Sequence, residues 1–93
     1  MIERQPHRKP EVELARRRFI SRYNEDALAL LKAADDVLLN KPEKGTATSK
    51  RGVFSIKIGV PEQSPIFIFE FSYSYTAQEV KIETFNWVPV HPR

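Results

Sequence analysis

The stretch Ile-Phe-Ile-Phe-Glu-Phe-Ser-Tyr-Ser-Tyr, residues 66–75, decides the fold that we expect of this chain of 93 residues. It is apolar on both faces at first and then alternates. Aromatic residues occupy every second position: Phe67, Phe69, Phe71, Tyr73 and Tyr75. A period of two is typical of a β-strand with one buried face. We therefore expect residues 65–75 to form the central strand of a sheet, with the aromatic row as the core face under a helix.

Two further strands flank this central strand. Residues 53–60 alternate between apolar and polar positions, and residues 79–88 alternate after a short loop at 76–78. The turn between the first two strands lies at residues 61–65. Pro89 closes the sheet edge, because proline cannot donate a ladder hydrogen bond. The sequence therefore predicts a three-stranded antiparallel β-meander.

Strict alternation in residues 79–88 separates two pairs of apolar side chains. Val80 and Ile82 fall on one face, whereas Phe85 and Trp87 share the other face with Lys81. If that second face meets solvent, the two aromatic side chains mark a contact surface, because large apolar groups in water need a partner to cover them. The alternative is that the N-terminal arm or the C-terminal tail folds over them.

An amphipathic helical segment precedes the strands. Residues 11–39 carry their apolar side chains in one stripe when they are placed at intervals of about 100°. Pro10 suits a first helical turn, and Pro42 ends the segment. A continuous helix would be about 44 Å long, which is longer than so small a domain can cover. We expect one kinked helix or two consecutive helices, with Asn24 as the break and as the cap of the second helix.

Composition bounds the class of protein. With 41% apolar and 29% charged residues, the composition is close to the average of globular proteins. A length of 93 residues is enough for one domain. Residues 1–10 show no apolar period, so we expect an irregular basic arm before a single α+β domain at residues 11–93. The sequence has no apolar run of bilayer length and no cysteine. We expect a cytoplasmic protein with no membrane partner.

Motifs that carry enzyme chemistry are absent from the sequence. The two histidines, His7 and His91, lie in proline-flanked terminal segments with no further ligands at a usable spacing, so we expect no metal site. The chain has no P-loop, no dinucleotide fingerprint and no nucleophile elbow. We expect no catalytic residue, no cofactor and no small-molecule substrate, which favours a protein that is not an enzyme.

Positive charge is concentrated in two zones. Residues 1–22 hold seven basic and three acidic residues, and residues 41–57 hold five basic and one acidic residue, whereas the rest of the chain is acidic. Two basic zones on an acidic body are typical of a phosphate-binding surface, the alternative being merely solubilising faces. The residues that we expect to bind are Arg8, Lys9, Arg16, Arg17, Arg18, Arg22, Lys50, Arg51, Lys57, Phe85 and Trp87.

Arg16 is the least expected residue of the helical stripe. It lies at the centre of the stripe, one turn from Val12 and from Phe19. Because an unpaired guanidinium is too costly to bury, this turn of helix must leave the core or meet an acidic partner. We expect the N-terminal half of the helix to project past the sheet and to present its arginines to a partner.

The order of helical segment, Lys-Pro turn, small loop and three-strand meander resembles the RelE/ParE toxin superfamily. Residues 51–59 look like the family's first meander strand, and residues 66–73 and 80–88 resemble the next two. The resemblance implies a ribosome-dependent mRNA nuclease or a gyrase inhibitor. In the nucleases it implies basic and aromatic catalytic residues on the strands.

The sequence departs from this family at the positions that carry activity. Ile66 and Phe67 stand where an arginine is usual, no histidine lies on a predicted strand, and the family's N-terminal strand is not evident before residue 11. Among the basic residues of the strands, Lys57 and Lys81 are the ones that could stand in. The resemblance therefore concerns the fold more than the activity.

We expect a small basic, non-enzymatic protein that binds or inhibits a nucleic acid or a nucleoprotein complex. Proteins of this kind occur in phages and mobile elements, for example as inhibitors of a host defence complex. Two alternatives remain open. One is a RelE/ParE-like toxin of a toxin-antitoxin pair that acts on mRNA or gyrase, and the other is a protein-protein adaptor that dimerises through its helix.

Overall fold

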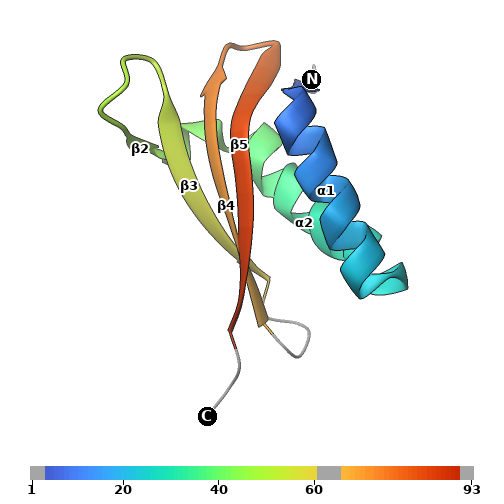
Figure 1. The fold of residues 1–93 in the computed structure, drawn as a ribbon. Helices are drawn as coiled ribbons and strands as arrows, with labels where there is room; N and C mark the ends of the chain where they lie inside the picture. Colours follow the sequence, from blue (N-terminus) through green and yellow to red (C-terminus); the bar gives the residue numbers. More distant parts are fainter. Residues whose placement is uncertain (1–3, 61–65, 91–93) are drawn as a thin grey trace.

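Two helices cover one face of a five-stranded sheet in the computed structural model, which describes residues 4–60 and 66–90 (Figure 1). The elements are β1 (Gln5–Arg8), α1 (Pro10–Tyr23), α2 (Glu25–Asn40), the 3-10 helix η1 (Pro42–Lys44), β2 (Thr46–Ala47), β3 (Phe54–Val60), β4 (Ile66–Tyr75) and β5 (Glu79–Val90). The strand order is β1-β5-β4-β3-β2. β1 runs parallel to β5, and the other neighbouring strands are antiparallel.

The expected three-stranded antiparallel sheet is wrong, because two more strands join β3, β4 and β5 in a mixed sheet. β1 lies within the segment that we expected to be an irregular arm. Its sequence, Gln-Pro-His-Arg, has no apolar alternation, yet it pairs along residues 79–82 of β5. An edge strand tolerates Pro6, since only one side of such a strand must supply ladder hydrogen bonds.

The helical segment consists of two consecutive helices that meet at Asn24, where the sequence suggests a break. Asn24 has a φ of 56°, in the left-handed range that asparagine tolerates better than most side chains. Its backbone N–H donates to the carbonyl of Ile20 at 2.7 Å and so ends α1. Its side chain makes no capping hydrogen bond to α2. Asn24 is therefore the N-cap residue of α2 by position, as expected, but its backbone and not its side chain makes the hydrogen bonds of the turn.

The aromatic row of β4 forms the core under the helices, as the sequence predicts. Phe67, Phe69, Phe71 and Tyr73 are at most 3% exposed. Phe19 of α1 packs edge-to-face on Phe67 and Phe69, with ring centroids 5.3 and 5.2 Å away. Complete burial of one such side chain contributes about 2–3 kcal/mol, so this row is the main source of stability.

Tyr73 also fixes the connection between the helices and the sheet. Its hydroxyl donates to the carbonyl of Pro42 in η1 at 2.5 Å, and burial raises the pKa of the phenol. A side chain at Gly45 would overlap this hydroxyl, so the residue that follows η1 must be glycine. The contact places β2 beside β3 and sets the start of the loop that follows it.

A β-bulge at Glu83 interrupts the alternation of β5. Ser72 of β4 pairs with Thr84, but its neighbour Tyr73 pairs with Ile82, which leaves Glu83 without a partner on β4. One extra residue in a strand moves all later side chains to the other face. The part of β5 after the bulge is therefore turned over relative to the alternation assumed from the sequence.

Because of the bulge, Phe85 and Trp87 lie on the helix side of the sheet. Phe85 is 4% exposed and stacks against Phe69 and Phe71, with centroids 5.8 and 5.2 Å away. Trp87 is partly buried against Phe19 at 5.3 Å. The two aromatic residues are parts of the core packing, and the expectation that they share a solvent face with Lys81 is wrong.

Arg16 does not project from the molecule. Its Nη1 donates to Asp35 Oδ1 on α2 at 3.1 Å, and its side chain is 16% exposed. Arg8 of β1 donates to the other oxygen of the same carboxylate at 3.2 Å. We call these residues the Asp35 triad. The expectation of a projecting helix end is wrong, because the acidic partner that Arg16 requires lies within the chain.

Candidate nucleic-acid interface

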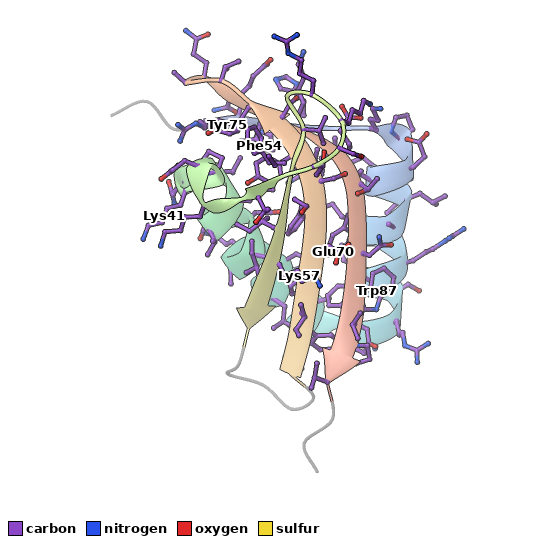
Figure 2. All side chains as sticks on the ribbon, turned by 90° about the vertical axis from the view of Figure 1, so that its left-hand side faces the viewer. Lys41, Phe54, Lys57, Glu70, Tyr75 and Trp87 are labelled. Carbon is purple, nitrogen blue, oxygen red and sulfur yellow. The ribbon has the colours of Figure 1, made fainter. Side chains whose placement is uncertain are left out.

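The face of the sheet opposite the helices, called the open face below, presents polar and charged side chains (Figure 2). Side chains alternate along each strand, so the residues between the buried aromatic positions of β4 point to this face. They include Ile68, Glu70, Ser72 and Ser74. All ten aromatic residues of the chain belong to the core or pack against it. The open face therefore has no aromatic side chain.

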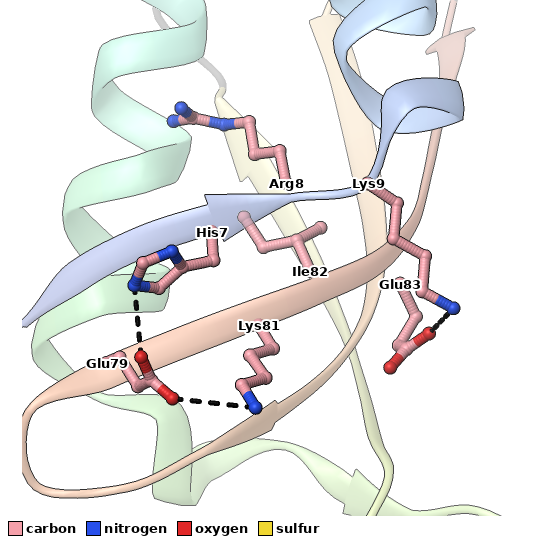
Figure 3. Close-up of a pocket in the computed structure, with 7 residues that line it drawn as sticks. All are labelled: His7, Arg8, Lys9, Glu79, Lys81, Ile82 and Glu83. Atoms are coloured by element: carbon pink, nitrogen blue, oxygen red, sulfur yellow. Dashed lines mark ion pairs between the residues drawn. The ribbon is translucent and has the colours of Figure 1, made fainter.

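Five titratable side chains gather on the open face where β1 meets β5 (Figure 3). We call them the bulge cluster: His7, Lys9, Glu79, Lys81 and Glu83. They line a shallow cavity of about 380 Å³. The parallel register places His7 beside Lys81 and Arg8 beside Ile82. Alternation then directs His7 and Lys9 to the open face and Arg8 to the helices.

Two sets of ion pairs connect the bulge cluster. His7 Nε2 lies 3.0 Å from one oxygen of Glu79, and the Lys81 ammonium lies 3.7 Å from the other. Lys9 pairs with Glu83 at the bulge. The hydrogen bond from Lys9 holds the pKa of the Glu83 carboxyl below its ordinary value, and the same contact raises the pKa of Lys9.

Glu83 has more than one cationic neighbour. Lys50 and Lys81 also lower its pKa, although less than Lys9 does, so both ammonium groups lie within electrostatic range. His7 and Lys81 pair with Glu79, Lys9 pairs with Glu83, and Lys50 adds a third ammonium group within electrostatic range. The group keeps a net positive charge, which suits an anionic ligand.

Lys50 lies on the loop between β2 and β3. The Thr48 hydroxyl donates to the carbonyl of Val53 at 2.8 Å and accepts the N–H of Lys50 at 3.2 Å. Gly52 has a φ of 78°, a left-handed conformation that glycine adopts without strain. This turn exposes Arg51, which has no ion pair with the side chains that the structure describes.

α1 supplies further cations beside the open face. Arg17, Arg18 and Arg22 are exposed, and none forms an ion pair with the described side chains. Arg16 faces α2, and residues on a helix are about 100° apart, so Arg18 and Arg22 lie about 200–240° round the axis from it. They occupy the flank of α1 away from α2, which is the side of β5. Arg17 points to solvent between the two flanks.

The structure brings some of the predicted binding residues together and separates others. Lys9, Lys50 and Lys57 lie on or at the open face, with Arg51 on the adjoining turn, and Arg18 and Arg22 border it. Lys57 is 74% exposed and 3.8 Å from Glu70. Arg8 and Arg16 are held in the Asp35 triad. Phe85 and Trp87 belong to the core packing described above.

Sequence reasoning missed four members of the bulge cluster as a site: His7, Glu79, Lys81 and Glu83. His7 was assigned to an irregular arm, and Lys81 was singled out through the family resemblance alone. The parallel pairing of β1 with β5 joins residues more than seventy positions apart. The sequence signal for this site is that every second residue from Glu79 to Glu83 is charged. A second signal is His7, in a segment that can pair at the edge of the sheet.

Two further findings concern the described residues. No three His, Asp or Glu side chains among them come close enough together to hold a metal ion. None of their helices is both long enough and apolar enough to span a membrane. Comparisons with family models, with curated proteins and with solved structures found no match to this chain.

Proposed function

We propose that the protein binds nucleic acid, free or in a nucleoprotein complex, through the open face, and that it acts without catalysis. The observation that carries this proposal is the cavity where β1 meets β5, which is lined by His7, Lys9 and Lys81, with Lys50 within electrostatic range of Glu83. Lysine ammonium groups on an accessible surface bind phosphate oxygens and release counterions.

The absence of aromatic side chains from the open face specifies the mode of binding. Sheet proteins that bind single-stranded RNA stack bases on exposed aromatic residues, each worth about 1–3 kcal/mol per base. Every aromatic residue of this chain packs in or on the core instead. The open face therefore contacts the phosphate backbone, and we expect it to prefer a duplex to an unpaired strand.

Substitution of Glu83 tests the proposal, because the proposal predicts tighter and not weaker binding to nucleic acid. Its carboxylate repels a phosphate that approaches the three lysines, so Glu83→Gln should tighten binding three- to tenfold. Lys81→Gln should weaken binding by a similar factor and reduce the log–log salt slope on duplex DNA by about 0.9. The measurement is fluorescence anisotropy with a labelled twenty-base-pair duplex between 50 and 200 mM salt.

The control is Lys32→Gln, which removes the same charge from an exposed position on α2, in the helix layer. It should change affinity less than twofold. Weaker binding by Glu83→Gln, or an unchanged salt slope for Lys81→Gln, would remove the bulge cluster from the interface.

A ribonuclease of the RelE/ParE type is a second candidate, favoured by His7. An imidazole 3.0 Å from Glu79, with Lys81 at 3.7 Å from the same carboxylate, supplies groups of the kind used in general acid-base cleavage of RNA. The two candidates differ in what they require of His7. Cleavage of RNA should be lost in His7→Gln, whereas duplex binding should persist in that variant.

A further inference from the structure

The outer edge of β3 has unpaired backbone groups. β2 pairs with β3 at Ser55 and Phe54 and then ends. From Ile56 to Gly59, β3 is bonded to β4 on one side, and no other described strand lies on its other side. Such an edge presents a row of N–H and C=O groups to any extended chain that reaches it.

Two adjoining hollows border this edge. The first, of about 460 Å³, is lined by Lys44, Thr46, Ser55, Ile56 and Lys57. The second, of about 350 Å³, is lined by Asp36, Val37, Asn40, Lys41 and Lys44. Lys44 lines both, so the space beside the strand continues to the C-terminal end of α2. Val37 adds an apolar side chain that is 39% exposed.

Positive charge dominates the border of this space. Lys41 and Lys44 are exposed and form no ion pair with the described side chains. Lys57 stands on β3 itself. Figure 2 shows Lys41 beyond the β3 edge of the sheet, whereas Lys57 points toward the viewer from the open face. The lysines thus flank the unpaired edge from both faces of the sheet. Asp36 is the one carboxylate that lines the two hollows, and Glu70 of β4 lies outside them, 3.8 Å from Lys57.

We propose that the outer edge of β3 receives an extended acidic segment of another protein as an added strand. Its backbone pairs with residues 56–59, and its carboxylates meet Lys44 and Lys57, which line one hollow. Apolar side chains that alternate with the acidic ones contact Ile56 and Val37 on the helix side. This surface lies at the opposite edge of the sheet from the bulge cluster, so the inference is independent of nucleic-acid binding.

A second copy of this chain fits the edge less well. Antiparallel pairing of two β3 strands across a two-fold axis would bring Lys57 of each copy close to Lys57 of the other. Like charges at neighbouring cross-strand positions oppose pairing. The charge of the edge therefore selects an acidic partner and disfavours self-association.

The test uses the full chain and a synthetic ten-residue peptide in which glutamate alternates with valine. We expect saturable binding, and at least tenfold slower hydrogen exchange at backbone amides within residues 56–59, measured by NMR. Lys44→Glu should weaken binding at least tenfold. Arg17→Glu, a charge reversal at an exposed position of α1 away from both hollows, should change it less than twofold.

A peptide in which lysine replaces glutamate is the control for charge. Failure of the acidic peptide to bind, equal binding of the lysine peptide, or binding without protection of residues 56–59 would each overturn the proposal. Loss of DNA binding alone would count against the proposed function and leave this inference standing.

Discussion

At the scale of single residues, Asp35 is the most constrained side chain of the fold. One carboxylate, 13% exposed, receives Arg16 at 3.1 Å and Arg8 at 3.2 Å from two different elements. The Arg8 Nε is buried and has no hydrogen-bond partner among the described groups. Asp35 thus compensates two guanidinium groups, and Arg8 has one further carboxylate nearby, that of the more exposed Glu13 at 3.8 Å.

Replacement of Asp35 by asparagine should lower the free energy of unfolding by about 2–4 kcal/mol, because it leaves the partly buried Arg16 without a counter-ion and Arg8 with only the more distant Glu13 at 3.8 Å. Asp36→Asn is the matched control. Asp36 pairs only with the exposed Lys32 at 3.4 Å, so its loss should cost less than about 0.5 kcal/mol. Urea unfolding of both variants provides the measurement. Equal effects would show that the Asp35 triad does not stabilise the fold.

Arg16→Leu should behave differently from Asp35→Asn. The substitution leaves Asp35 still paired with Arg8 and places an apolar side chain beside the core, so the unfolding free energy should change by less than about 1 kcal/mol. Duplex affinity should stay within twofold of the wild-type value, since Arg16 does not reach the open face. A tenfold loss of affinity without a change in stability would restore Arg16 as a binding residue.

Acid should weaken the pair of Lys9 and Glu83. The pKa of Glu83 is lowered from 4.5, so its contribution to stability is present above that value and disappears as the pH falls through the lowered pKa. The pKa of Lys9 is raised from 10.5, so at the alkaline end the contribution disappears only as the pH rises through the raised value. The stability difference between wild type and Glu83→Gln should therefore shrink below pH 4. An NMR titration of the Glu83 carboxyl would contradict this if it gave an ordinary midpoint.

At the scale of elements, the apolar periodicity of the sequence predicts which faces are buried. It fails where the backbone of a strand departs from regular alternation. The aromatic row of β4 and the break at Asn24 follow from the sequence, since apolar spacing and turn preference are local properties. β1 does not, because its four residues acquire strand conformation only by pairing with β5. The change of face of the β5 side chains after Glu83 could not be predicted either, because a single unpaired residue does not alter the apolar pattern of the sequence.

Half of the candidate site could be predicted for a similar reason. Charge counting finds Lys9, Lys50 and Arg51, since a basic run needs no tertiary information. It also selects Arg8 and Arg16, whose partner is visible only when α2 packs beside α1 and β1. A count of basic residues cannot identify Glu79 and Glu83 as members of the site. An acidic residue contributes to an anion-binding site only by orienting the cations beside it.

The turn between the helices offers a test at this scale. Asn24→Gly should raise the free energy of unfolding by about 1 kcal/mol, because its φ of 56° with a ψ of −127° is strained for a residue with a side chain. Asn24→Val should lower it by a larger amount. Thermal melts of the two variants should shift in opposite directions. A fall in both melting temperatures would mean that the asparagine side chain supports the turn.

At the scale of the whole molecule, the two faces of the sheet have separate tasks. The helix face holds the aromatic core, and the open face remains available, with its cations at the β1 and β5 edge. The flank of α1 that carries Arg18 and Arg22 borders the same edge. The proposed nucleic-acid interface therefore extends from the sheet to one side of the helix layer.

Two neighbouring arginines test this geometry. Arg18→Glu and Arg17→Glu change the net charge equally, but Arg18 lies on the β5 flank of α1 and Arg17 does not. Reversal of Arg18 should weaken duplex binding about tenfold, and reversal of Arg17 no more than threefold. Anisotropy at 100 mM salt measures both. Equal losses would indicate that net charge, and not the position of the interface, determines affinity.

The parallel pairing of β1 with β5 has a consequence for biosynthesis. His7 and Lys9 leave the ribosome among the first residues described here, whereas their partners Glu79, Lys81 and Glu83 follow near the end of the described chain. β1 has no strand to pair with until β5 has emerged, so the bulge cluster cannot assemble before β5 has been synthesised. A fragment that ends before residue 79 would carry most of the positive charge but not the assembled site. Nucleic-acid binding would thus begin only after β5 has been translated.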